Sequence, residues 1–102
     1  MKFPLRLLAG LLFSAAPLAQ AQDAPLGRSL AATCANCHGT NGQARGESIP
    51  LAGVAADRIV AAFADFKSGA RPATIMHQIA KGYTDDQVKL IAAYFAAQPA
   101  KR

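Results

Sequence analysis

The chain has 102 residues, of which 52% are hydrophobic and 7% are aromatic, with no tryptophan and a formal net charge of +5. This length suits one small domain and excludes an architecture of several domains with separate cores. The charge gives no reason to predict nucleic-acid binding. Without Lys2 and Arg6, which lie in a segment that we expect to be cleaved, nine basic residues face six acidic ones and the balance falls to +3.

The first 21 residues have the pattern of a secretory signal peptide. Lys2 and Arg6 give a positive start, which is followed by a short apolar run at 7–13 and by the small-x-small cleavage sequence Ala-Gln-Ala at 19–21. The apolar run falls well below the ~20 residues that a membrane-spanning helix needs. We therefore expect cleavage after about Ala21, export to the periplasm, no stable membrane insertion, and one mature domain over residues 22–102.

The first helix of the mature domain is predicted to begin near Asp23, as its N-cap, with Pro25 close to the first helical position. Leu26, Leu30 and Cys34 follow at intervals of four residues and form one stripe. This helix therefore delivers a cysteine at its C-terminal end.

That cysteine opens the sequence Cys-Ala-Asn-Cys-His at 34–38, which has the C-x-x-C-H pattern of covalent haem attachment. Residues three apart on a helical turn lie on one face, so the sulfurs of Cys34 and Cys37 can both form thioether bonds with one porphyrin. The adjacent His38 would then be carried beneath the iron as the proximal ligand, one of the standard ways in which a protein holds haem iron.

Three other functions fit a bare C-x-x-C pair: a thiol–disulfide redox motif, half of a zinc site and a small structural disulfide. Zinc would need two more ligands, and beyond the motif only His77 remains, with no further cysteine. A thioredoxin-like motif would lie in a β-α-β context, and no neighbouring stretch has the pattern of a strand. Together with the predicted export signal, these points favour haem.

Residues 39–53 have no helical period and are rich in Gly, Asn, Ser and Pro, which predicts a long loop. Long loops in small domains tend to be functional, and the edge of a haem would give this one a surface to pack on. Its apolar part is Ile49-Pro50-Leu51.

A second helix is predicted from residue 55 or 56 to about 67, with Ser68-Gly69 as its stop signal. Phe63 and Phe66 lie on its apolar face, and we expect both to pack on the haem as core residues. An electron relay is not needed to explain them.

A short third helix is predicted from about 75 to 80, with Thr74 as its cap and Gly82 at its end. It carries Met76, the one methionine left after signal removal and a candidate for the sixth iron ligand, because Met raises the potential of an electron-transfer haem. Its neighbour His77 is the rival ligand. Adjacent helical residues do not share a direction, so only one of the two can face the iron.

The last helix follows the capping-box pattern of Thr84 with Gln three residues later. Its apolar stripe is formed by Val88, Ile91 and Phe95. No stretch has the pattern of a strand, and the sequence contains neither an internal repeat nor a second C-x-x-C-H. The predicted fold class is therefore all-α, with one domain and one haem.

The chain resembles a class I cytochrome c over essentially all of the predicted mature domain. The residues that carry the resemblance are Cys-Ala-Asn-Cys-His-Gly at 34–39, Ile-Pro-Leu-Ala-Gly at 49–53 and the lone Met76 before an amphipathic C-terminal helix. The resemblance implies that the carbonyl of Pro50 accepts a hydrogen bond from His38, which fixes the ring tautomer and raises its basicity. It also implies that the N- and C-terminal helices cross, with Gly27 near Tyr94.

Residues 66–72 and 74–83 carry a closer similarity, to the cytochrome subunit of flavocytochrome c sulfide dehydrogenase. In that family the Met of this segment is the sixth ligand, which favours Met76 over His77. The subunit receives electrons from a flavoprotein that oxidises sulfide. Some members carry two haem domains, whereas this sequence has one C-x-x-C-H motif.

These observations predict a small monohaem cytochrome c with Cys34, Cys37 and Pro50 as cofactor-binding residues and with His38 and Met76 as iron ligands. Its function would be periplasmic electron transfer, with electrons accepted from a flavoprotein sulfide dehydrogenase subunit and with no catalysis of its own. Two alternatives stay open. One is a stand-alone shuttle to a terminal oxidase or another dehydrogenase, and the other is a haem enzyme or sensor with an open sixth position.

Overall fold

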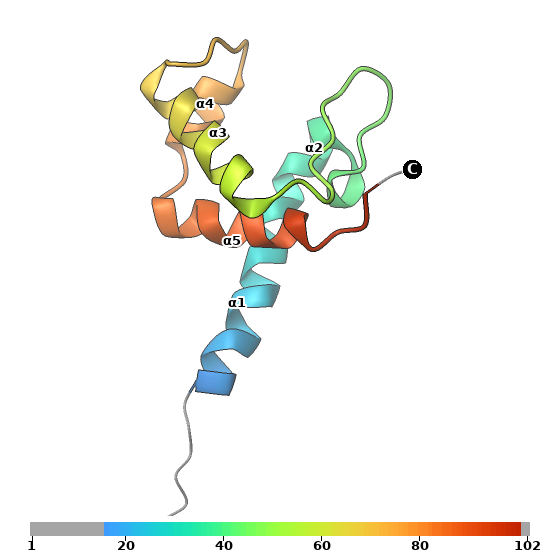
Figure 1. Ribbon diagram of the computed structural model, residues 1–102, viewed down its shortest axis with the longest axis vertical. Helices are drawn as coiled ribbons and strands as arrows, with labels where there is room; N and C mark the ends of the chain where they lie inside the picture. Colours follow the sequence, from blue (N-terminus) through green and yellow to red (C-terminus); the bar gives the residue numbers. More distant parts are fainter. Residues whose placement is uncertain (1–15, 101–102) are drawn as a thin grey trace, which may run out of the picture.

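The computed structural model of the protein describes residues 16–100, and the regular elements within that range are all helical (Figure 1). In chain order they are α1 (Ala16–Ala31), η1 (Ala32–Cys34), α2 (Ala35–His38), η2 (Thr40–Gly42), α3 (Ala56–Ser68), α4 (Met76–Lys81) and α5 (Asp85–Ala96). The predicted all-α fold class is confirmed. Most of the predicted signal peptide lies outside the described residues and stays a prediction. None of the helices in the described range is long and apolar enough to span a membrane.

The start of α1 differs from the sequence prediction. Asp23 does not cap this helix, which begins at Ala16 and has Pro25 in its interior. Proline has no backbone N–H, so in a helix interior it removes a hydrogen bond, whereas in the first turn that N–H would have no helical partner in any case. Pro25 therefore suits a helix that begins at about residue 22, which is the start that the predicted cleavage would create.

The cysteine motif lies where the N-terminal helical run tightens and stops. After α1 the chain passes through η1, which ends at Cys34, into the short α2, which ends at His38. Gly39 then turns the chain with φ 82° and ψ 162°, a conformation that is essentially restricted to glycine. A Cβ at this position would lie 2.2 Å from the carbonyl oxygen of Gln43. This turn starts the loop back alongside the motif.

The loop after η2 folds back on η2 and on the end of α5. The N–H groups of Leu51 and Ala52 both donate to the carbonyl of Gly42, at 2.9 and 3.1 Å. The N–H of Gly53 donates to the carbonyl of Phe95 at 2.9 Å. These bonds fix the apolar part of the predicted loop against the core.

The core forms where α5 packs against both α1 and α3. In Figure 1, α5 runs across the fold. Most of α1 lies on one side of α5, and α2, α3 and α4 lie on the other side. The buried side chains of the core cluster are Ala31, Ile59, Phe63, Ala80, Val88, Ile91, Ala92 and Phe95. The predicted apolar stripe of α5 is thus confirmed as its buried face.

Helices α1 and α5 approach each other closely at Gly27. A Cβ on Gly27 would lie 2.8 Å from the carbonyl oxygen of Leu90. The family resemblance implied Tyr94 as the neighbour of Gly27, so the crossing lies one helical turn earlier on α5 than expected. Leu90 and Tyr94 are four residues apart and lie on the same face of the helix. The crossing therefore involves the predicted pair of helices and the predicted face of α5.

The predicted start and stop signals have mixed outcomes. Gly69 ends α3 in the left-handed conformation, with φ 82°, and the capping box of α5 is formed in both directions. The Thr84 hydroxyl accepts from the N–H of Gln87 at 3.1 Å, and the Gln87 side chain accepts from the N–H of Thr84 at 2.9 Å. The prediction of Thr74 as a cap is wrong, because Ile75 occupies the N-cap of α4 and makes no side-chain cap bond.

Candidate haem site

The two cysteines of the motif lie at the junction of η1 and α2. Cys34 is half-buried, Cys37 is exposed, and no disulfide joins them. Burial raises the pKa of the Cys34 thiol above its ordinary value, against the lowering effect of hydrogen bonds that involve Thr33 and the backbone. A thiol with a raised pKa stays protonated at neutral pH and forms disulfides slowly. Both cysteines are free thiols in the structure, the form from which thioether bonds are made.

His38, at the end of α2, is oriented by the loop that follows it. Its Nδ1 atom lies 2.7 Å from the carbonyl oxygen of Ile49. A carbonyl oxygen only accepts hydrogen bonds, so Nδ1 carries the proton and donates, and Nε2 keeps its lone pair. This is the tautomer that binds a metal through Nε2 while a backbone carbonyl fixes the ring.

The acceptor of this bond differs from the expected one by a single residue. The resemblance implied the carbonyl of Pro50, whereas the structure uses that of Ile49, in the peptide bond that joins Ile49 to Pro50. A proline restricts the residue before it to extended conformations. Pro50 therefore acts on the orientation of the Ile49 carbonyl and not through its own.

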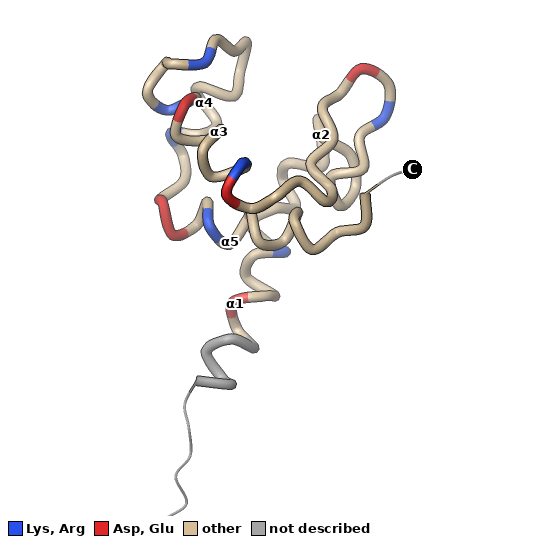
Figure 2. The backbone as a smooth tube through the Cα atoms, in the orientation of Figure 1, with Lys and Arg blue, Asp and Glu red and all other residues tan. Residues whose placement is uncertain are grey.

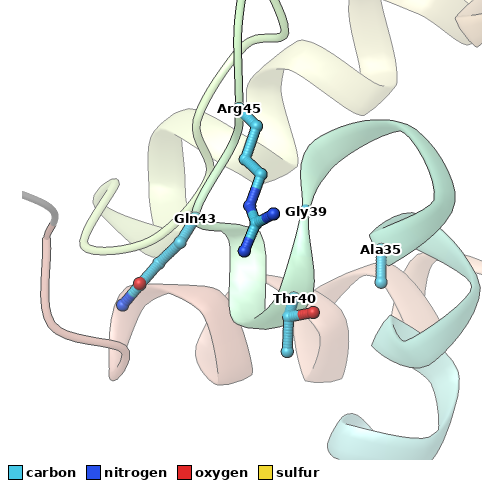
Figure 3. A pocket seen from close by; sticks show the side chains of 5 residues that line it. All are labelled: Ala35, Gly39, Thr40, Gln43 and Arg45. Atoms are coloured by element: carbon cyan, nitrogen blue, oxygen red, sulfur yellow. The ribbon is translucent and has the colours of Figure 1, made fainter.

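A pocket of about 450 Å³ opens beside the motif (Figure 3). Its lining residues are Ala35, Gly39, Thr40, Gln43 and Arg45. In Figure 3 the guanidinium of Arg45 reaches from the loop into the space between Gln43 and Gly39. Neither Cys34 nor Cys37 is among the lining residues, although Ala35 lies between them in the sequence.

Met76 and His77 open α4 and have different surroundings. Both are partly buried, and Met76 packs against the core cluster. The Nδ1 atom of His77 is, within residues 22–100, the one buried side-chain polar atom without a hydrogen-bond partner. Figure 1 places α4 and α2 on the same side of α5, although the two helices make no extensive contact with each other. The two predicted iron ligands thus come from separate elements that stand on one side of the fold.

The side chains of the motif do not form a direct ion site. In the part of the chain that the structure describes, no group of three or more His, Cys, Asp or Glu side chains could hold a metal ion. Cys34, Cys37 and His38 therefore do not converge on one point at ligand distances. Attachment to different atoms of one large group, as haem requires, does not need such convergence.

Figure 2 shows positions of charged residues in several separate segments of the described backbone. The Lys67 ammonium donates to the carbonyl of Tyr83 and lies 3.7 Å from the carboxylate of Asp85. The Arg71 guanidinium lies over the ring of Phe66, 5.4 Å from its centroid. These two cations are engaged within the protein.

Two hydrogen bonds between side chains join segments that the sequence analysis did not connect. The hydroxyl oxygens of Thr33 and Tyr83 lie 3.0 Å apart, and the hydroxyl of Tyr94 donates to the side-chain oxygen of Asn41. The partners are 50 and 53 positions apart in the sequence. No periodicity or capping signal links residues over such distances, so a single sequence could not have revealed either pair.

Comparison with known proteins gives no match to a family model but several curated relatives. The chain is 42% identical over 69 residues to the cytochrome subunit of sulfide dehydrogenase of Chlorobaculum tepidum, which is 68% of this chain and 63% of that protein. It is 34% identical over 82 residues to cytochrome c-554(548) of Halomonas halodenitrificans, covering 76% of this chain and 99% of that one. It is also 39% identical over 70 residues to a thiosulfate dehydrogenase electron acceptor of Thiomonas intermedia, covering 65% and 32%.

These relatives differ in the share of their own length that the chain covers. The chain spans nearly the whole of the Halomonas protein, but less than two thirds of the Chlorobaculum protein and about a third of the Thiomonas protein. A full-length match fixes the kind of protein, whereas the partial matches concern one part of longer chains.

Proposed function

Since this chain belongs to the class I cytochromes c, with covalently bound haem c and electron transfer as its function, we propose that it accepts electrons in the periplasm from a flavoprotein that oxidises sulfide. The haem supplies an iron that alternates between the ferric and ferrous states. The similarity to a cytochrome subunit of sulfide dehydrogenase supports the choice of partner. The rest of that relative's activity depends on chains and residues beyond the matched part.

Cys34 and Cys37 would hold the porphyrin, each by adding its S–H across one vinyl double bond, a reaction that needs no oxidant. His38 would give the lone pair of Nε2 to the iron. The hydrogen bond from His38 Nδ1 to the Ile49 carbonyl carries this assignment, because it leaves Nε2 free beside two free thiols and raises the basicity of the ring.

Met76 would supply the second axial ligand from α4. The large apolar side chains next to the two proposed ligands are exposed, Ile49 at 69% and Ile75 at 56%. Large apolar residues that remain exposed beside a site fit a ligand with an apolar surface, and a porphyrin offers such a surface to both. A thioether ligand in place of His77 would raise the potential of the haem.

Export and cleavage after about Ala21 complete the proposal. The cleavage sequence at 19–21 supports them, and so does the position of Pro25, which belongs in a first helical turn. The proposed mature protein would then keep the part of α1 that follows Ala21, which includes Gly27 at the contact with α5.

The experiment that tests the partner is gentle purification of the exported, C-terminally tagged protein from the periplasm, followed by addition of sulfide. We expect a flavoprotein to co-elute and sulfide to reduce the haem within the enzyme's turnover time. The control is the same cytochrome after a salt wash that strips its partner, which sulfide should reduce only slowly. Elution of the cytochrome alone, with equally slow reduction before and after the wash, would argue for a free shuttle.

A thiosulfate-oxidising partner is the second candidate, and the likeness to a thiosulfate dehydrogenase electron acceptor favours it. The same purified material distinguishes the two partners. Reduction of the haem by thiosulfate and not by sulfide would replace the first proposal with the second, while the haem assignment would stand.

A further inference from the structure

Two side-chain pairs connect distant segments, and each involves a different one of the two segments that carry the proposed iron ligands. Within residues 22–100 they are the only hydrogen bonds between two side chains. Tyr94 reaches Asn41, three residues after His38, so this pair belongs to the histidine side. Tyr83 reaches Thr33 from the far end of the segment that carries Met76. The two tyrosines therefore secure different parts of the site.

Thr33 stands directly before Cys34. Its hydroxyl lies 3.4 Å from the carbonyl of Leu30, to which it can donate. In the contact between Thr33 and Tyr83 either hydroxyl can be the donor. A hydrogen-bonding partner of Tyr83 thus lies one residue from the haem-attaching cysteine.

Tyr83 lies between α4 and α5 and is held from several directions. Its ring meets the ring of Phe63 edge to face, with centroids 6.2 Å apart. Its carbonyl accepts from the ammonium of Lys67, and its N–H donates to the carbonyl of Ala80 in α4. A residue fixed in this way transmits any constraint on its hydroxyl to the end of α4.

Helix α4 has little support of its own. It spans six residues and has no side-chain cap, and a helix this short is not stable alone. Its buried anchor is Ala80, at 0% exposure. Between the segment at 69–83 and the motif-bearing region at 22–42, the Tyr83–Thr33 bond is the only hydrogen bond in the structure.

We propose that the Tyr83–Thr33 hydrogen bond is a positioning contact that keeps the Met76 segment closed against the cysteine helix, and so limits the access of outside ligands to the iron. This inference rests on the proposed ligation by Met76. An outside ligand can replace Met76 at the iron only after the segment that carries Met76 has moved away. The loss of one hydrogen bond of ordinary net strength corresponds to about a fivefold change in an equilibrium constant.

The test uses the ferric holoprotein and its Tyr83→Phe and Thr33→Val variants, each of which removes a hydroxyl and little else. Two rates are measured: the binding of imidazole to the haem, by absorbance, and the hydrogen exchange of backbone amides in residues 76–82. We expect both rates to rise about fivefold in either variant. The double variant should rise no further than the single ones, because both substitutions break the same bond.

Tyr94→Phe is the matched control, since it removes the other tyrosine hydroxyl of a side-chain pair. It should lower the unfolding midpoint to a similar extent as Tyr83→Phe and leave both rates unchanged. Equal acceleration in Tyr94→Phe would reduce the Tyr83 effect to general destabilisation and overturn the proposal. Faster amide exchange without faster imidazole binding would also overturn it, and would separate closure of the segment from ligation by Met76.

Discussion

At the scale of single residues, the site depends on where one backbone carbonyl is held. The tautomer of His38 follows from the position of the Ile49 carbonyl, and that position follows from how tightly the chain turns after the motif. The turn is made by Gly39, whose backbone conformation is essentially restricted to glycine. A side chain at this position would therefore disturb the turn that follows His38.

Gly39→Ala should destabilise the holoprotein by about 3 kcal/mol or more, because the backbone strain adds to an overlap with the Gln43 carbonyl. Gly69→Ala is the matched control. Gly69 also has φ 82°, but a Cβ there would meet nothing within 4 Å, so we expect a loss of only about 1 kcal/mol. Denaturant unfolding of the two variants measures the difference. Equal losses would contradict the close approach of Gly39 to Gln43.

At the scale of helices, local sequence signals correctly predicted the features that depend only on residues close together in the sequence. The apolar period of α5 and the Thr84 capping box are confirmed, because both involve residues within one or two turns. The Thr74 cap is wrong. A hydroxyl before a short helix is only one of several groups that can start it, and α4 is anchored by Ala80, which is buried in the core cluster.

The contrast between the two threonines can be measured directly. Thr84→Ala should lower the free energy of unfolding by about 1 kcal/mol, because it leaves the Gln87 N–H without its acceptor. Thr74→Ala, at an exposed position without a cap bond, should change it by less than about 0.5 kcal/mol. A larger effect at Thr74 than at Thr84 would mean that α4 begins differently from the structure.

The parts of the site that could not be predicted are contacts between segments. The spacing of the motif identified Cys34, Cys37 and His38 as the residues that would hold haem, because all three lie within five consecutive residues. The acceptor for His38 was placed one residue too late, since local sequence does not specify which of two adjacent carbonyls faces a ring. The Tyr83–Thr33 pair was missed altogether because tertiary packing alone brings it together.

At the scale of the whole molecule, the position of Pro25 in α1 bears on whether the N-terminal segment is removed. In the full chain α1 has this proline in its interior, whereas cleavage after about Ala21 would place it in the first turn. We therefore expect intact mass spectrometry of the exported protein to show a chain that begins near Gln22 and carries one haem. A mass that still includes residues 1–21 would contradict the predicted signal peptide.

The central claim is that the chain holds a six-coordinate electron-transfer haem between His38 and Met76. The measurement that tests it most directly is the absorption spectrum of the ferric holoprotein, compared with those of Met76→Ala and His77→Ala. We predict a low-spin spectrum with a Met–iron band that Met76→Ala abolishes and His77→Ala leaves in place. Loss of the low-spin spectrum in His77→Ala alone, or a high-spin spectrum in the unaltered protein, would contradict the claim.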